Sequence, residues 1–219
     1  LSKVEVFYKD YFDLTIDKGT YPEEVFKNDG IGKAGGLELM LQKLDKTNYE
    51  GWLSYTFSKT RRKDNEGWFT PDYDLTHMLN LFVDYQLTKN QSIVTTLKLN
   101  TGGLYTPIIS VDTNPMTGAL VYNRGSRNSA RFKNYFRIDL WYEYEGTSIV
   151  VPIPFLPLSE NKLLGIFPII KLPGSTRIGV NNLLNSSNPI RYFWSKDNNR
   201  AEYVYDFPRI PIIGHKFVF

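Results

Sequence analysis

Pro211-Ile212-Ile213-Gly214-His215-Lys216-Phe217-Val218-Phe219 closes the sequence and gives the clearest indication of its fold class. Its residues alternate between two faces, one with Phe219, Phe217, His215 and Ile213, the other with Val218, Lys216, Gly214 and Ile212. A period of two predicts a β-strand with an aromatic face and a more polar face. The last strand of a closed membrane barrel can end in this way, because its outward aromatic side chains lie at the lipid–water interface. The final strand of a soluble β-sandwich stays open as an alternative at this point.

Long stretches of the same alternation recur along the chain, and we expect about eight strands. Their expected ranges are 3–16, 32–43, 52–59, 75–87, 92–101, 132–145, 175–185 and 202–219, the last interrupted by Pro208 and Pro211. Several of these strands reach a dozen residues, whereas strands of soluble sheets usually have about five or six. A tilted membrane strand needs ~9–11 residues to cross the hydrocarbon. The strand lengths therefore favour a membrane barrel.

The connections between these strands alternate in length. Short turns are expected at 45–48 and 88–91, and long loops at 17–30, 61–74, 102–131 and 186–199. Long loops at one end only are typical of an outer-membrane barrel, whose periplasmic turns are short. The predicted fold class is therefore all-β, an antiparallel up-and-down transmembrane β-barrel segment. Gly146–Gly174 departs from the pattern because its five prolines remove strand donors, and we interpret it as a connection with two short strand extensions.

The composition excludes several other classes of protein. Aromatic residues make up 15% of the 219 residues while the mean hydropathy is -0.33, which suits strands with one apolar and one polar face. No apolar run approaches the ~20 residues of a membrane helix. The lack of cysteine excludes disulfides and thiolate metal sites, and a net charge of +3 gives no reason to expect a nucleic acid partner. The chain starts at Leu1 without a signal peptide, so we expect a processed or trimmed piece.

Six short motifs follow one another along the chain: Gly32–Leu39, Gly51–Ser58, Tyr73–Leu81, Arg137–Leu140, Val180–Asn185 and the terminal Gly214-x-x-Phe217-x-Phe219. Together and in this order they resemble the C-terminal part of the barrel of TonB-dependent outer-membrane receptors. The terminal motif also resembles the C-terminal signal that the barrel-assembly machinery recognises. This resemblance implies that Gly214, Phe217 and Phe219 are the residues of that signal. Ile212 departs from the signal, because a polar residue is usual there. Gly146–Gly174 departs from the family, which usually has a short turn at this place.

The resemblance implies a 22-stranded barrel and an N-terminal plug domain. Residues 1–219 would then be the C-terminal portion of the barrel, with about eight strands and no plug, and their two open edges would require the remaining strands. The implied location is the outer membrane of a Gram-negative-type bacterium, as a multi-pass protein. The implied partners are the rest of the same receptor, the TonB complex, the barrel-assembly machinery and outer-membrane lipid.

The same resemblance implies a receptor-transporter that binds a scarce nutrient at its external loops and imports it with energy from TonB. Ferric siderophores, haem, cobalamin, glycans and peptides are all imported by receptors with these motifs, so the ligand stays open. No cofactor and no nucleic acid partner are implied. The chain has only two histidines, His77 and His215, far apart in the sequence, and no catalytic constellation is recognised, so we expect neither an enzyme nor a metal site.

Two sets of residues are candidates for function. Charged residues at expected inward positions are predicted to face the lumen of the barrel: Glu38, Asp84, Arg137, Asp139 and Glu143. A charge that faces lipid at the midplane costs ~2–4 kcal/mol for Arg or Lys, which is the reason for an inward Arg137. Aromatic and cationic loop residues are predicted to line an external ligand surface: Trp68, Phe69, Tyr73, Arg191, Tyr192 and Trp194. Plain alternation of a polar face is the favoured explanation of the first set, and an interfacial aromatic girdle explains the aromatic members of the second about as well as a ligand surface does.

Two other hypotheses stay open on the sequence. One is a small self-contained outer-membrane barrel of eight to ten strands, either porin-like or an enzyme. The other is a soluble β-sandwich that serves as a binding module. A sandwich would have to cover the apolar face that carries Leu53, Tyr55 and Phe57 with a second sheet, whereas a membrane barrel leaves that face to lipid.

Overall fold

The structure is a computed structural model that describes residues 1–17, 26–44, 48–64, 66–146, 174–198 and 200–217. All of its regular elements are strands. Within these ranges, no helix has the length and apolarity needed to cross a membrane. The Pro-rich stretch 147–173 and most of the short turn expected at 45–48 lie outside the described residues.

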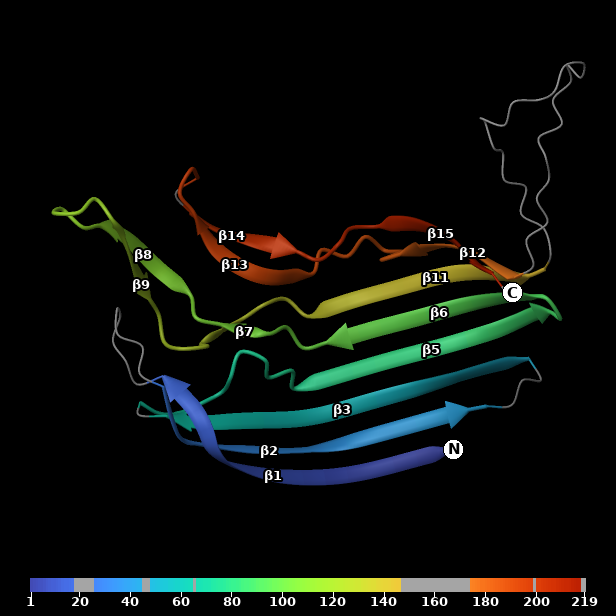
Figure 1. Cartoon of the computed structure of the whole chain (residues 1–219), viewed down its shortest axis with the longest axis horizontal. Coiled ribbons are helices and arrows are strands. Elements are labelled where there is room, and N and C mark those ends of the chain that lie inside the picture. The colour runs from blue at the N-terminus through green and yellow to red at the C-terminus, as the bar shows by residue number, and fades with distance from the viewer. Residues whose placement is uncertain (18–25, 45–47, 65, 147–173, 199, 218–219) are drawn as a thin grey trace, which may run out of the picture.

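Eight long strands form one antiparallel sheet in which each strand pairs with the next long strand along the chain (Figure 1). They are β1 (Ser2–Asp17), β2 (Phe26–Lys43), β3 (Tyr49–Asp64), β5 (His77–Thr88), β6 (Gln91–Asn100), β11 (Tyr135–Glu145), β12 (Gly174–Asn181) and β15 (Ile210–Phe217). The short strand β4 (Gly67–Phe69) pairs with the end of β3. This is the up-and-down order that the sequence predicts, and the fold class is confirmed.

The register of the sheet separates apolar from polar residues. One row of directly paired residues contains Leu41, Leu53, Leu81, Leu97 and Ile138. The next row on the same face contains Val4, Leu39, Tyr55, Leu79, Leu99 and Phe136. Between them, on the opposite face, lies the row of Lys3, Met40, Ser54, Asn80, Lys98 and Arg137. Because side chains alternate along each strand, the sheet has an apolar face and a polar face over its whole width.

No second layer covers the apolar face in the part of the chain that the structure describes. Ala34 and Val94 are the only buried hydrophobic residues there, at 8% and 4% exposure, and the register places both on the polar face. On the apolar face Leu41 is 55% exposed and Ile213 is 77% exposed. A soluble sandwich would bury these side chains against another sheet, so the fold contradicts the sandwich hypothesis.

The sheet is open along two edges. β1 pairs only with β2, β15 pairs only with β12, and no pairing among the described residues joins β1 to β15. This disagrees with a self-contained barrel, which would close the first strand on the last.

Two of the expected long loops are folded into small hairpins. Residues 102–131 contain β7 (Leu104–Tyr105), β8 (Ile108–Thr113), β9 (Leu120–Arg124) and β10 (Ala130–Arg131), with β8 paired to β9 and β10 to β7. Residues 186–199 provide β13 (Pro189–Ser195), which pairs with β14 (Arg200–Tyr205). The expected closing strand from Glu202 is therefore wrong at its start, because residues up to Tyr205 pair in this hairpin and β15 begins at Ile210. These hairpins lie together at the left-hand end of the sheet in Figure 1, which we call the loop end.

Other strands extend beyond their expected limits. β2 begins at Phe26 and β3 continues to Asp64, so the expected loops at 17–30 and 61–74 are partly strand. The charged residues at the end of β3 did not look like strand by composition, but the backbone groups of residues 61–63 pair with β2. The turn between β5 and β6 is short, as predicted, since β5 ends at Thr88 and β6 begins at Gln91.

Two buried asparagines hold the chain where it leaves the sheet after β12. The Asn188 side chain accepts from the Phe136 amide at 2.9 Å and donates to the Phe136 carbonyl at 3.0 Å, so it replaces a missing strand neighbour of β11. The Asn182 side chain donates to the carbonyls of Ser186 and Phe207, and its backbone amide donates to Asp139 at 2.7 Å. Both asparagines are 1% exposed. They fix the start of the β13–β14 hairpin relative to the sheet.

Candidate ligand-binding site at the loop end

Five aromatic residues from different segments form one cluster at the loop end: Tyr105, Phe132, Tyr192, Tyr203 and Tyr205. Tyr105 stacks on Phe132 with ring centroids 4.5 Å apart, and the ring of Tyr192 lies 4.8 Å from that of Tyr105. Tyr203 meets Phe132 edge-on at 6.1 Å. Since such aromatic pairs each add ~0.5–1.5 kcal/mol beyond burial, this aromatic cluster holds the separate loops together.

Hydrogen bonds from tyrosine hydroxyls strengthen these contacts. The Ile108 backbone amide donates to the Tyr192 hydroxyl at 2.8 Å, which joins β13 to β8. The hydroxyls of Tyr105 and Tyr203 lie 3.3 Å apart. The hydrogen bond to Tyr203, together with burial, raises the pKa of Tyr105 to about 12. The phenol of Tyr105 is therefore neutral at physiological pH.

An ion pair positions the segments below the aromatic cluster. Asp74 is 5% exposed, and its carboxylate accepts from the Thr60 amide at 2.9 Å. Arg131 donates to the carbonyls of Asp74 and Gly102 at 3.1 and 2.6 Å, and its guanidinium lies 3.4 Å from the Asp74 carboxylate. One guanidinium thus ties the loop before β5 to the segment before β7. Because the Asp74 carboxylate is buried and paired with Arg131 in this way, this ion pair has a structural role.

A hollow of about 590 Å³ lies beside the aromatic cluster. Tyr105, Phe132 and Tyr192 line it, together with the exposed cations Arg124, Lys133 and Arg191. Asp72 is the one carboxylate among its described lining residues. The excess of cations attracts an anion, and the aromatic rings offer flat apolar surface to the rest of the molecule. Chemically the hollow suits an anionic ligand with planar or apolar parts.

The structure brings together three of the six residues predicted for an external ligand surface. Tyr73, Arg191 and Tyr192 line the hollow. Trp68 and Phe69 lie on the β3–β4 hairpin and line a separate depression, where the Arg127 guanidinium stacks 3.5 Å from the centroid of the Phe69 ring. Trp194 lies on β13 and does not line either space. A role in ligand binding stays a prediction for all six.

Sequence reasoning missed several residues of the hollow: Tyr105, Phe132, Arg124 and Lys133. Tyr105 and Arg124 fall in the expected loop 102–131, and Phe132 and Lys133 fall at the start of an expected strand, and neither position indicates which residues are neighbours in space. Tyr203 falls in the expected closing strand 202–219, whereas in the structure it lies in β14 and β15 begins at Ile210. The alternation of Tyr203 and Tyr205 opposite Tyr192 was the available signal for a hairpin.

The five residues predicted to face the lumen share one face of the sheet, because the register places Glu38, Asp84, Arg137, Asp139 and Glu143 in rows of the polar face. The Arg137 guanidinium donates to Asp139 at 2.7 Å and lies 3.8 Å from Asp206. Glu143 accepts from Arg177 at 2.9 Å. Glu38 stands apart from these pairs. Whether this face lines a lumen stays a prediction.

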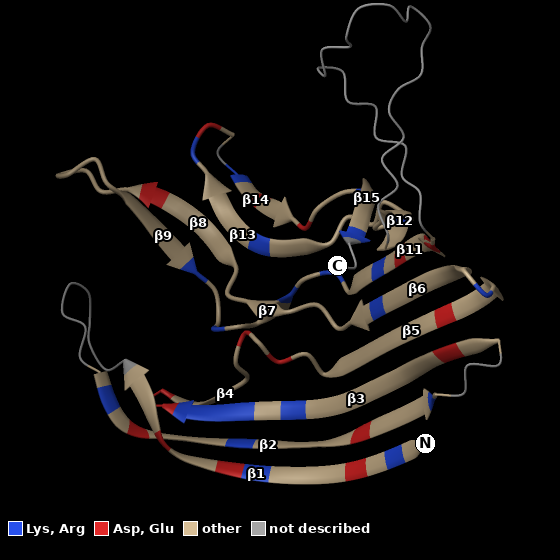
Figure 2. Ribbon diagram, turned by 45° about the vertical axis from the view of Figure 1, so that its right-hand side comes forward, with Lys and Arg blue, Asp and Glu red and all other residues tan. Residues whose placement is uncertain are grey.

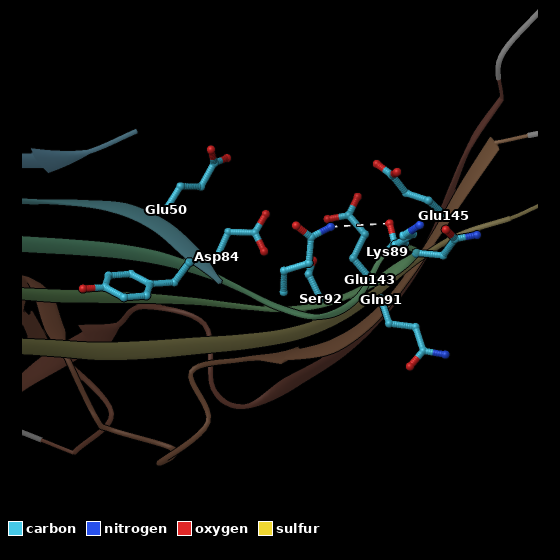
Figure 3. Close-up of a pocket in the computed structure, with 10 residues that line it drawn as sticks. Glu50, Asp84, Lys89, Gln91, Ser92, Glu143 and Glu145 are labelled. Carbon is cyan, nitrogen blue, oxygen red and sulfur yellow. Dashed lines mark hydrogen bonds between the residues drawn. The ribbon is translucent and has the colours of Figure 1, made fainter. Parts of the chain in front are cut away.

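Asp84 and Glu143 meet in a second hollow, of about 310 Å³, at the short-turn end of the sheet. Glu50, Asp84 and Glu143 point to the same side of the sheet there, whereas Gln91 points to the other side (Figure 3). Within the described residues no group of His, Asp or Glu side chains has an arrangement that could hold a metal ion. We regard this acidic hollow as part of the polar face.

The terminal motif is partly described. Gly214 lies in β15 opposite Arg177, and β15 ends at Phe217, opposite Gly174. Phe219 lies outside the described residues. The assembly-signal role of Gly214, Phe217 and Phe219 stays a prediction.

A single open up-and-down sheet with an exposed apolar face and hairpins at one end is the architecture of a segment of a large transmembrane β-barrel. Three solved structures are similar to it. The ferric-catecholate import receptor Fiu of Escherichia coli K12 shares 14% sequence identity at a TM-score of 0.56, over 97% of this chain and 24% of the receptor. The ferripyoverdine receptor of the Pseudomonas aeruginosa outer membrane shares 12% at a TM-score of 0.52, over 95% and 23%. The outer membrane transporter YddB of Escherichia coli shares 11% at a TM-score of 0.56, over 97% and 29%.

The resemblance to the C-terminal part of the barrel of TonB-dependent receptors is confirmed at the level of the fold. This chain spans 23% to 29% of the length of the three structures. No protein-family model matches the chain, and no curated protein matches it.

Proposed function

We propose that residues 1–219 are the C-terminal portion of the barrel of an outer-membrane receptor-transporter whose plug domain and remaining strands lie outside this sequence. The receptor binds an anionic nutrient, such as a ferric chelate or haem, in the loop-end hollow. TonB supplies the energy for import. The barrel-assembly machinery inserts the protein through the motif that ends at Phe219.

The observation that carries this proposal is the composition of the loop-end hollow. Arg124, Lys133 and Arg191 reach it from three separate segments, beside the stacked rings of Tyr105 and Phe132. The apolar face of the sheet, left bare by the described residues, supports a membrane location. Fiu and the ferripyoverdine receptor, which are named for ferric ligands, have the same fold.

The test is an uptake assay in cells that express the full-length protein. Radiolabelled iron is supplied as ferric citrate, as a ferric catecholate or as haem, with and without a functional TonB complex. We expect at least one probe to accumulate only in cells that have both the protein and TonB, and the protein to fractionate with the outer membrane. Uptake that is unaffected by loss of TonB, or a protein recovered in the soluble fraction, would contradict the proposal.

A further inference from the structure

Cationic side chains gather on the apolar face of the sheet where β2 and β3 reach the loop end. Lys59, Arg61 and Lys63 follow Phe57 at every second position of β3, so they continue the face that carries Leu53, Tyr55 and Phe57. The register places Lys33 of β2 directly beside Arg61. Figure 2 shows this end of β3 as a nearly continuous blue band. We call Lys33, Lys59, Arg61 and Lys63 the basic strip.

The described residues do not neutralise the basic strip. All four side chains are exposed, and none lies within 4.0 Å of a described carboxylate. Asp10, opposite Lys33, is the one acidic neighbour that the register gives them on this face. Four arginines of the polar face and loops behave differently, since Arg127, Arg131, Arg137 and Arg177 each pair with a carboxylate. The strip therefore keeps its positive charge for an external partner.

The place of the basic strip on the strand determines which partner it suits. Val6, Leu37, Phe57 and His77 form the last mainly apolar row before the strip, and Tyr8, Gly35 and Lys59 form the next row on that face. At about 3.3 Å per residue, Lys59 lies ~7 Å beyond Phe57 and Lys63 lies ~20 Å beyond it. Trp68, which pairs with Lys63 and is 40% exposed, adds an indole to the same face. An amphiphile with acyl chains against the apolar rows would present its headgroup to these cations.

We propose that the basic strip binds the phosphate groups of a phosphorylated lipid in the leaflet that surrounds the loop end. The acyl chains of that lipid pack on the apolar rows below, and its phosphates contact Lys59, Arg61 and Lys63 from the outside of the sheet. This inference rests on the proposed function in one respect: both assume that the apolar face of the sheet lies in a membrane. It concerns the outer surface of the sheet and not the ligand hollow.

The test uses the full-length protein in a neutral detergent and lipid A, which carries two phosphates, as the probe in mixed micelles. The variant is Lys59→Gln/Arg61→Gln/Lys63→Gln, and the matched control is Lys89→Gln/Lys196→Gln/Arg209→Gln, which removes the same charge from exposed positions elsewhere. A cation near an anionic lipid surface contributes about 1 kcal/mol, or about five-fold in affinity, so the three together predict a loss on the order of 100-fold. The control should bind within about two-fold of the wild type. Heat-modifiability on a gel verifies that each variant is folded.

Three outcomes would overturn the inference: lipid A binding unchanged in the strip variant, equal loss in the control variant, or binding of phosphatidylcholine as tight as that of lipid A. Competition by inorganic phosphate alone at low millimolar concentration would also overturn it, since it would indicate a free-anion site. Competition by heparin without any by phosphatidylglycerol would indicate a polyanion partner instead of a lipid. Outer-membrane fractionation and uptake are measured separately on the wild type. They test the proposed function independently of the result for lipid A binding.

Discussion

At the scale of single residues, the protein separates charges that build the structure from charges that are free to bind. Arg131 is held by Asp74 and the Gly102 carbonyl, and Arg137 is held by Asp139. Arg191 is exposed and faces the loop-end hollow. The same residue type thus has two roles, and only its neighbours in space distinguish them.

Arg191→Gln should weaken the binding of an anionic ligand without loss of the fold. The substitution removes one of three cations that line the hollow, and a hydrogen bond to a charged ligand is worth ~1.5–3 kcal/mol when formed, so we expect about a ten-fold rise in Kd. Lys196→Gln is the control, because Lys196 is also exposed but does not line the hollow. The Kd for the probe that the uptake assay identifies is measured by quenching of tryptophan fluorescence. Equal effects of the two substitutions would argue against the hollow as the binding site.

Asn182→Ala should destabilise the barrel. It leaves the Ser186 and Phe207 carbonyls and the Ser186 amide without their side-chain partner, and it places alanine at a backbone φ of 52°. Unsatisfied buried groups cost ~1–3 kcal/mol each, so we expect a loss of about 2–4 kcal/mol. Asn181→Ala is the control, because the Asn181 side-chain oxygen has no partner among the described residues. Urea titration in detergent measures both, and comparable losses would refute the role given to Asn182.

At the scale of elements, the hairpins are the parts that assemble the candidate site. β8 and β9, β13 and β14, and the β7–β10 pair are each too small to be stable alone. They are joined by the aromatic cluster and by the contact between Tyr192 and Ile108. Binding geometry at the loop end therefore depends on contacts between hairpins and not on any one of them.

Tyr192→Phe should loosen β8 from β13 while it keeps the ring in place. The change removes the acceptor of the Ile108 amide, a bond worth about 1 kcal/mol, so hydrogen exchange at that amide should become about five-fold faster. Tyr122→Phe, on the exposed strand β9, serves as the control. Hydrogen exchange of the β8 peptides, followed by mass spectrometry, reports both. No change in exchange at Ile108 would mean that the ring contact between Tyr192 and Tyr105 is sufficient to hold the hairpins.

At the scale of the whole molecule, the open sheet is the dominant feature. Its apolar face has no cover and its two edges have no partner among the described residues. Exposed strand edges and apolar faces favour aggregation in water and are not tolerated in lipid unless paired. We therefore expect that this part of the chain requires the rest of a barrel.

Residues 1–219 expressed alone should fail to form a stable barrel. We expect aggregates, or material that shows no heat-modifiable band near its mass of 25.4 kDa, when the chain is refolded in detergent. The full-length receptor, refolded in parallel, should give such a band at its own mass. A folded, monomeric product with a Ser2→Cys/Ile213→Cys cross-link between β1 and β15 would show a small complete barrel and overturn the expectation.

The amino-acid sequence alone predicts the strand period, the number of long strands and the presence of long connections at one end of the sheet. These follow from local alternation, because each residue of a strand faces the side opposite to its neighbours. It also grouped Glu38, Asp84, Arg137, Asp139 and Glu143 on one face for the same reason. Tyr73, Arg191 and Tyr192 were selected from composition alone, and the structure places them together.

Which loop residues share a site depends on tertiary contacts that the sequence does not reveal. Tyr105, Phe132 and Tyr203 are up to 98 residues apart, and nothing in the local pattern indicates that their rings meet. The tertiary structure also decided the start of β15, because pairing with β13 assigned Glu202–Tyr205 to β14. Strand periodicity is a local property, because it follows from the alternation of side chains along one segment. Contacts between hairpins join segments that are distant in the sequence, so they depend on how the sheet places the hairpins side by side.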